Sequence, residues 1–166
     1  MVKSKQIILV CVVVVTAIAA YFVFSQSKTE KVKMQFEFIA EKFNKEKGES
    51  PIIAAANANK IKEVFTDPFF VQAPAYDIFR EASTDDIPPF VLSIRSQYSE
   101  ISLKFYDYDI EFPAEETAHV SVTERMRAKL TTGEYVEDVN ELSCRLEKID
   151  DNWLITEIEI VEVLKK

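Results

Sequence analysis

Residues 7–24 form an uninterrupted run of 18 residues without a charged side chain, IILVCVVVVTAIAAYFVF. As an α-helix, such a run spans roughly 27 Å at about 1.5 Å per residue, close to the thickness of the hydrocarbon core of a bilayer. A buried helix of a globular domain is usually apolar on one side only, whereas this run is apolar on every side. We therefore expect a transmembrane anchor, preceded by a short tail over residues 1–6 and followed by a linker over residues 25–28.

Two kinds of segment have this pattern, a retained anchor and a cleaved signal peptide. Ala17-Ile18-Ala19 fits the small-residue pattern of a cleavage site, but cleavage there would leave residues 21–24 as an apolar stub, which favours retention. Lysines stand on both sides of the run, so the short N-terminal tail is what favours a cytoplasmic N-terminus. We expect a single-pass protein of the inner (cytoplasmic) membrane with an extracytoplasmic, periplasmic C-terminal domain.

The chain beyond the run is acidic. Two of the 20 basic residues, Lys3 and Lys5, precede the run, and the other 18 follow it with all 28 acidic residues, a net charge of −10. Such a surface excludes a nucleic-acid partner and is repelled by anionic lipid headgroups. We expect contact with the membrane through residues 7–24 only.

Composition also excludes several kinds of cofactor site. The chain has two glycines in all, too few for a phosphate-binding loop or a dinucleotide-binding turn, which need several close together. One histidine and two distant cysteines, Cys11 and Cys144, do not make a usual zinc site or a disulfide framework. We expect no cofactor and no metal.

Apolar residues recur at helical spacing in three segments of the N-terminal half. The first begins near Thr29. The second has Ser50 as its N-cap and a proline at its first position, with Ile53 and Ile61 on its apolar side. The third follows the capping residues 83–86 and carries two prolines in its first turn, where they are tolerated. We expect three helices.

Strand patterns fill the rest. FFVQAP and YDIFREA, between the second and third helices, are typical of two short strands, and the chain after Tyr98 alternates as four long antiparallel strands. The apolar face of the first long strand changes parity near Tyr106-Asp107, which predicts a bulge. The last strand, from Trp153 to Leu164, is apolar on both faces in part, which indicates cover on both sides or a further bulge.

Charge pairing gives a register for the hairpin of strands 117–130 and 135–148. If facing residue numbers sum to 266, Arg125 faces Glu141 and His119 faces Glu147, while apolar residues face each other on the other side. Such cross-strand pairs contribute about 0.2–1 kcal/mol each. We expect this register.

The order of helices and strands resembles the nuclear transport factor 2-like (NTF2-like, SnoaL-like, cystatin-like) superfamily. The segments that carry the likeness are DPFFVQAP, YDIFREASTDDIPPFVLSIRSQY and NWLITEIEIVEVL, and it covers about residues 29–164. The resemblance implies an α+β cone over residues 29–166, with three N-terminal helices packed on a strongly curved antiparallel sheet. The superfamily contains enzymes, ligand binders and membrane-anchored assembly subunits such as those of type IV secretion.

An N-terminal anchor followed directly by such a domain is most similar to the assembly subunits. We therefore expect a noncatalytic interaction or assembly module with a protein partner or a second copy of itself. The alternatives are a binder of a small apolar ligand in the cone and, third, an isomerase-like or hydrolase-like enzyme. Fold alone does not decide among them.

Polar residues that interrupt apolar strand faces are the candidate site. Glu124, Asp138 and Asn140 are expected together near one end of the hairpin on the concave side, and Tyr76 and Tyr98 are candidates for the rim of a ligand pocket. We expect the two carboxyls to stay hydrated and the pKa of Glu124 to keep its ordinary value of about 4.3. His119 is expected on the polar surface, and Cys144 is expected to pack as a small apolar side chain. No residue is assigned a catalytic role.

Overall fold

The computed structural model describes residue 14 and residues 27–163. The predicted tail and, apart from residue 14, the predicted anchor over residues 7–24 lie outside these residues. Within the described part of the chain, no helix is long and apolar enough to cross a membrane. The chain divides into two units, 1–33 and 34–166. In the first unit, residues 27–33 are helical.

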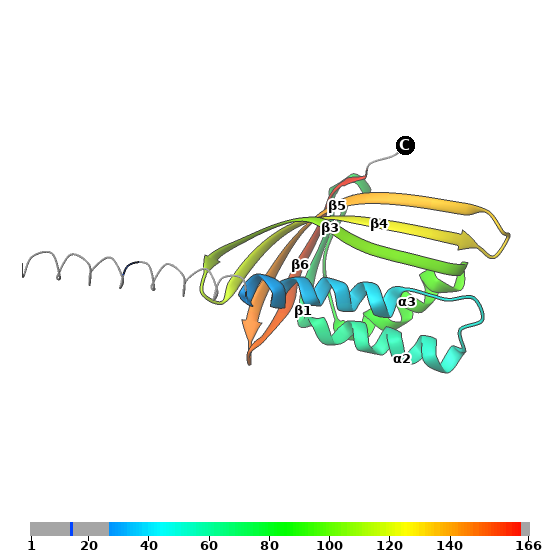
Figure 1. Ribbon diagram of the computed structural model, residues 1–166, viewed down its shortest axis with the longest axis horizontal. Coiled ribbons are helices and arrows are strands. Elements are labelled where there is room, and N and C mark those ends of the chain that lie inside the picture. Colours follow the sequence, from blue (N-terminus) through cyan, green and yellow to red (C-terminus); the bar gives the residue numbers. More distant parts are fainter. Residues whose placement is uncertain (1–13, 15–26, 164–166) are drawn as a thin grey trace, which may run out of the picture. The chain divides into compact units, whose positions relative to one another are not determined.

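The second unit is an α+β domain, as predicted. Its helices are residues 34–43, α2 (Pro51–Ile61) and α3 (Ile87–Ser96), and they lie on one side of a six-stranded mixed sheet (Figure 1). Short 3-10 helices, η1 (Lys62–Val64), η2 (Pro74–Tyr76) and η3 (Thr84–Asp86), join the elements. The second helix begins where the sequence predicts, because the Ser50 hydroxyl accepts a hydrogen bond from the Ile53 amide at 3.3 Å.

The six strands are β1 (Phe65–Ala73), β2 (Ile78–Ala82), β3 (Tyr98–Ala114), β4 (Thr117–Leu130), β5 (Tyr135–Ile149) and β6 (Asn152–Val163). Their order across the sheet is β2-β1-β6-β5-β4-β3. Contrary to the predicted antiparallel sheet, β1 and β6 are parallel, and all other neighbours are antiparallel. The two short and four long strands are therefore present as predicted. Their order across the sheet was not predicted.

The predicted bulge in the first long strand is present. The pairing of β3 with β4 shifts between Tyr106 and Asp109, and Asp107 between them adopts a left-handed backbone with φ of 55°. β6 is also bulged, since its pairing with β5 shifts twice. A bulge turns the following side chains to the other face, which explains the change of parity in the sequence.

The predicted register of the β4–β5 hairpin is wrong by two residues. The numbers of two facing residues sum to 264 instead of 266. Arg125 therefore faces Val139, and Ser121 faces Ser143. The cause is the turn, in which the Gly133 amide donates to the Leu130 carbonyl at 2.9 Å and the Leu130 amide donates to the Glu134 carbonyl at 2.8 Å. Gly133, with φ of 100°, is the left-handed third residue of a three-residue loop. The turn therefore sets the register, and a shift of two keeps every side chain on its predicted face.

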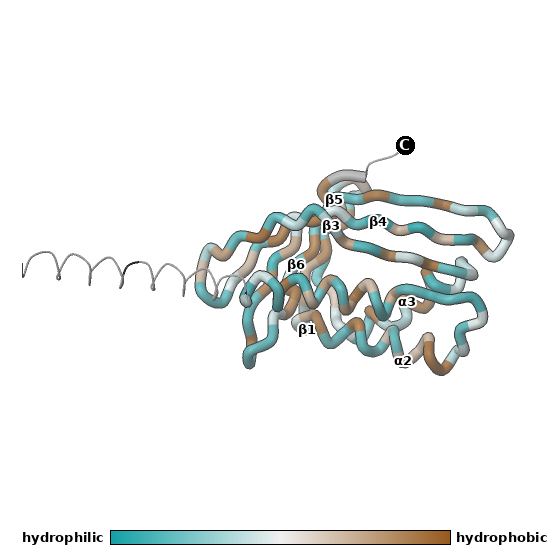
Figure 2. Tube along the Cα trace, viewed as in Figure 1, coloured by the Kyte–Doolittle hydropathy of each residue, from teal (hydrophilic) through white to brown (hydrophobic). Residues whose placement is uncertain are grey.

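Apolar and polar residues alternate along the long strands (Figure 2). On β4, Ala118, Val120 and Val122 are buried on one face. A second buried group joins α2, α3 and the two short strands, and it consists of Ala58, Ile61, Phe69, Ala82, Ile87 and Val91. Because α2 reaches this group only with its C-terminal half, Ile53 in its first turn is exposed, contrary to prediction.

Candidate functional site

The face of the sheet that packs on the helices is filled by large side chains. The ring of Phe36, from the helical residues 34–43, lies edge-on to Phe105 at 5.5 Å and to Tyr108 at 5.8 Å between centroids. At the other end of β3, the ring of Phe112 lies 5.7 Å from that of Trp153. Side chains less than 2% exposed in this unit include Trp153, Phe36, Leu146, Ile155, Val120 and Val122. The concave face is therefore packed as a core at these positions.

One carboxyl interrupts this packing. Glu124 on β4 faces Phe105 on β3 and Asn140 on β5, and the Asn140 Nδ2 donates a hydrogen bond to the Glu124 Oε2 at 3.0 Å. The two residues are half-buried, and Val122, the next residue on the same face of β4, is fully buried. The structure thus brings together two of the predicted site residues.

Burial raises the pKa of the Glu124 carboxyl above its ordinary value. The hydrogen bond from Asn140 opposes this rise, and the negative charge of Asp138 adds to it. The expectation that Glu124 keeps an ordinary pKa is therefore wrong, because the apolar side chains around it reduce its hydration. A half-buried carboxyl with a raised pKa can exchange a proton nearer to neutral pH than an ordinary glutamate.

The other candidate residues are more dispersed. Asp138 lies in the next row of the same face, opposite Met126, and is exposed to water as predicted. Tyr98 begins β3 and faces Leu130 at the far end of the hairpin, so it does not join Glu124. Tyr76 belongs to η2, and its side chain lies outside what the structure describes.

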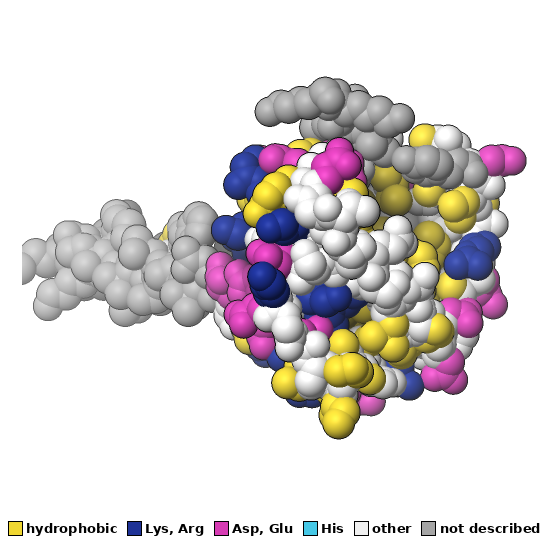
Figure 3. Space-filling view, turned by 90° about the vertical axis from the view of Figure 1, so that its right-hand side faces the viewer, with side chains coloured by type: hydrophobic (Ala, Val, Ile, Leu, Met, Phe, Trp, Pro, Cys, Tyr) yellow, Lys and Arg dark blue, Asp and Glu magenta, His cyan; other side chains and the backbone are white. Residues whose placement is uncertain are grey.

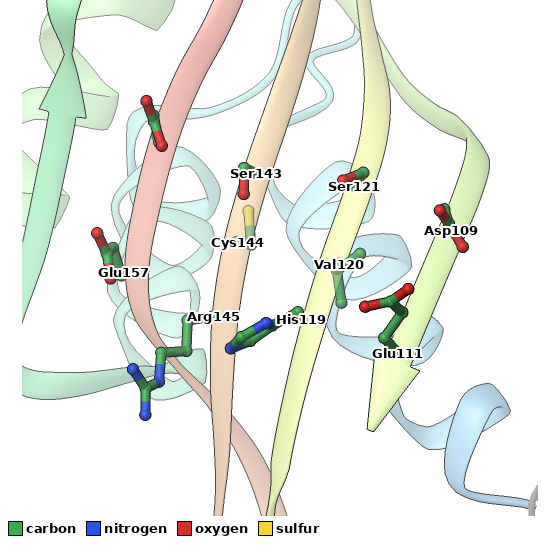
Figure 4. Close-up of a pocket in the computed structure, with 10 residues that line it drawn as sticks. Asp109, Glu111, His119, Val120, Ser121, Ser143, Cys144, Arg145 and Glu157 are labelled. Carbon is green, nitrogen blue, oxygen red and sulfur yellow. The ribbon is translucent and has the colours of Figure 1, made fainter. Parts of the chain in front are cut away.

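A polar hollow that the sequence pattern does not predict lies on the opposite, outer face of the sheet. It measures about 380 Å³ and is lined by two neighbouring rows of side chains across β3 to β6. One row contains Asp109, Ser121, Ser143 and Glu159, and the other contains Glu111, His119, Arg145 and Glu157. Figure 4 shows His119 on β4 between Glu111 on β3 and Arg145 on β5.

His119 is exposed on the polar face, as predicted, but its partner is different. It faces Arg145 rather than Glu147, because of the two-residue shift in register, while Arg145 lies 3.8 Å from Glu147 along the same strand. The alternation of β4 and β5 already placed these side chains on one outer face. Their alignment in rows also depends on the hairpin turn, whose register the sequence pattern predicted wrongly.

Neither face offers a metal centre or a reactive thiol in the part of the chain that the structure describes. Among residue 14 and residues 27–163, no group of three or more His, Cys, Asp or Glu side chains is arranged to hold a metal ion. Cys144 is buried opposite Val120, and burial raises its pKa to about 12. Its thiol therefore stays protonated and packs as a small apolar group, as predicted.

Comparison with known proteins identifies the fold and no closer relationship. No model of a protein family matches the chain, and no curated protein sequence matches it. Solved structures do match. The Kfla4162 protein of Kribbella flavida has a TM-score of 0.69 and 10% sequence identity over 85% of this chain and 93% of that one.

Two further structures show how widely the fold is used. A hexachlorocyclohexane dehydrochlorinase of Novosphingobium barchaimii has a TM-score of 0.62 and 6% identity over 84% of this chain and 90% of its own. A protein of unknown function with a cystatin-like fold, from Nostoc punctiforme, has a TM-score of 0.58 and 9% identity over 81% and 90%. At such identities the likeness establishes the fold alone. Three helices on a six-stranded mixed sheet match an NTF2-like cone.

Proposed function

We propose that this chain is a noncatalytic interaction or assembly module, an NTF2-like domain held on the extracytoplasmic side of the inner membrane by residues 7–24. The observation that carries the proposal is the filling of the concave face by aromatic and aliphatic side chains. A ligand binder or enzyme that worked from this face would need open space there. At the positions described above, the rings of Phe36, Phe105 and Tyr108 occupy that space.

The membrane part of the proposal rests on the sequence. Residues 7–24 have the length and the lack of charge that a membrane-spanning helix needs, and the domain that follows is acidic. An anchored domain reaches its partners in two dimensions, which raises its effective concentration near other membrane-bound chains. This favours a role in holding or assembling proteins at the membrane surface.

Capture of partners tests the proposal directly. The full-length chain, tagged at its C-terminus, is purified from membranes in a mild detergent, and co-purifying proteins are identified by mass spectrometry. We expect a protein partner or a second copy of the chain at near-stoichiometric yield. Recovery of the chain alone, with a small molecule bound in native mass spectrometry, would contradict the proposal and support a ligand binder.

The half-buried Glu124–Asn140 pair is the observation that favours the alternatives. A carboxyl with a raised pKa beside apolar side chains suits the polar end of a small apolar ligand, or the general base of an isomerase-like or hydrolase-like enzyme. Under the proposed function, Glu124→Gln leaves partner capture unchanged, with Asp138→Asn as the matched control on the same face. Loss of a bound small molecule or of a turnover in Glu124→Gln alone would favour the alternatives.

Protease protection tests the location. In a double-membrane bacterium, we expect the domain to resist added protease in intact cells and to be digested after the outer membrane is opened. A cytoplasmic protein serves as the control for an intact inner membrane. Digestion only after the inner membrane is also broken would place the domain in the cytoplasm and contradict the proposed orientation.

A further inference from the structure

The two short helices expose a surface with little charge, in which Lys60 in the last turn of α2 is the exposed cation. Residues 51–59 (PIIAAANAN) and residues 87–94 (IPPFVLSI) contain no charged side chain, although charged residues make up 29% of the chain. The first run covers most of α2 and the second most of α3, and the two helices pack on each other. We call the exposed side chains of these two runs the α2–α3 surface.

Large apolar side chains of the α2–α3 surface are exposed to solvent. Ile52 is 83% exposed, Ile53 is 53% exposed and Phe90 is 62% exposed. Figure 3 shows hydrophobic side chains along the lower part of the face turned to the viewer, and Figure 1 places α2 at the lower edge of the domain. Exposed isoleucine and phenylalanine on neighbouring helices indicate an interaction surface.

Two ion pairs lie at the borders of this surface, and the exposed Lys60 directly follows the first run. At one end Lys62 and Asp85 form an ion pair at 3.1 Å, and at the other end Arg95 and Glu49 form a buried one at 2.7 Å. In each pair the opposite charges of the two side chains neutralise each other. The α2–α3 surface itself therefore carries no charge, in a domain with an excess of negative charge.

The exposed ring of Phe70 lies among charges. Phe70 on β1 stands between Glu81 on β2 and Glu157 on β6. The outer hollow carries four carboxylates, so two copies that met there would oppose like charges. The part of the chain after residue 24 has a net charge of −10, so two copies of it repel each other. The contact that costs least electrostatically is one between surfaces without charge.

We propose that the α2–α3 surface binds the α2–α3 surface of a second copy of this chain. In a two-fold dimer the same patch faces itself, so a neutral, apolar patch satisfies both sides at once. Ridges of four short helices would interdigitate, as in other helix–helix contacts. The inference rests on the proposed function, because it names the partner of the interaction module, and anchoring by residues 7–24 would concentrate the copies in the plane of the membrane.

Site-specific photocrosslinking in membranes tests the dimer. Phe90 in the full-length chain is replaced by the photoreactive p-benzoylphenylalanine, and the matched controls carry it at Phe79 on β2 or at Tyr135 at the hairpin tip. All three positions are aromatic and strongly exposed. We expect a product of twice the chain mass, containing only this chain, at Phe90, with at least tenfold less at the two controls.

A charge on the surface tests the role of its neutrality. Ile52→Glu places a carboxylate on each half of the contact and is expected to lower the Phe90 product at least tenfold. Val161→Glu, at a residue on β6 that is 55% exposed, is the matched control and leaves the yield within twofold. Circular dichroism of both variants shows whether the fold is kept, and an unfolded Ile52→Glu is replaced by Ile52→Lys.

The dependence of the dimer yield on salt distinguishes an apolar contact from a contact made by ion pairs. Raising NaCl from 0.1 M to 1 M shortens the Debye length from about 10 Å to about 3 Å, which screens the repulsion between two acidic chains. The dimer yield at Phe90 is therefore expected to rise at least twofold, whereas a contact through charged rows would weaken. Equal yields at Phe90 and the controls, or no product of twice the chain mass at Phe90, overturn the dimer. A product at Phe90 with a different protein also overturns it but leaves the proposed function standing.

Discussion

The Nη2 of Arg95 on α3 lies 2.8 Å and 2.7 Å from the two carboxylate oxygens of Glu49, in an ion pair that is almost fully buried. The same guanidinium donates to the carbonyls of Asn44, at 3.0 Å, and Ala54, at 3.4 Å. The Lys45 ammonium donates to the carbonyls of Arg95 and Tyr98, at 2.9 Å and 2.7 Å. One buried cation therefore joins α3 to the start of α2 and to the segment that precedes it.

Removing the charge of one partner of the Arg95–Glu49 ion pair should destabilise the fold strongly. Glu49→Gln leaves the guanidinium buried without its carboxylate, and we expect the free energy of unfolding to fall by about 3–5 kcal/mol. Urea unfolding of the detergent-solubilised chain measures it. Asp85→Asn, which breaks the exposed pair with Lys62, is the control and should change stability little. An equally small loss in Glu49→Gln would show that the buried pair does not hold these segments together.

Glu124 should titrate above the ordinary range of a glutamate. NMR titration of the side-chain carboxyls measures its midpoint, and Glu137, whose pKa is lowered by its hydrogen bond with Arg125, is an internal reference that should titrate below the ordinary value. Asn140→Ala removes a hydrogen bond that favours the charged form, so the pKa of Glu124 should rise further. A midpoint for Glu124 at or below that of Glu137 would contradict the burial of its carboxyl.

The same shift predicts how stability depends on pH. Because the folded chain holds the Glu124 proton more tightly than the unfolded chain, this residue's contribution to the free energy of unfolding falls as pH rises from the ordinary glutamate pKa to the raised one. Above the raised pKa, the contribution of Glu124 to the free energy of unfolding no longer changes with pH. In Glu124→Gln this fall should disappear, and the variant should be at least as stable as the parent at neutral pH. Unfolding curves of both proteins between pH 4 and pH 8, at about one-unit steps, check this.

The hairpin register can be tested by disulfide formation. Ser121 and Ser143 face each other on the outer face, so cysteines at both positions should form a disulfide under mild oxidation. Cysteines at Ser121 and Arg145 would face each other only in the register with a sum of 266 and should remain reduced. Thiol counting and peptide mapping distinguish the two variants, with the buried Cys144 present in both. A disulfide in the second variant alone would show that the hairpin has the register with a sum of 266, in which Arg125 faces Glu141.

Gly133 should be needed for its backbone conformation rather than for space. A Cβ at this position would meet no atom within 4 Å, but its φ of 100° is strained for any other L-residue. We expect Gly133→Ala to lower the free energy of unfolding by about 1 kcal/mol and Gly133→Asn to cost less, because asparagine tolerates left-handed backbone better than alanine. Equal stability of all three chains in urea would show that the turn has another conformation.

Local patterns in the sequence determined the kind and the limits of most elements. Ser50 and the prolines of the third helix place helix starts, since a cap or a missing amide acts only on its own turn. Alternation determined which face each side chain of β4 and β5 occupies, and the change of parity near Asp107 located the bulge. These are effects of neighbouring residues, which the sequence displays directly.

Contacts between distant residues were decided by the tertiary structure. The register depends on the left-handed backbone of Gly133, which outweighed the exposed pair of Arg125 with Glu141 that the sequence favoured. The burial of Arg95 and the raised pKa of Glu124 depend on which segments close over them, and so does the outer hollow around His119. Burial and cross-strand alignment result from the whole chain packing at once, so residue spacing alone predicts the face of a side chain but not its partner.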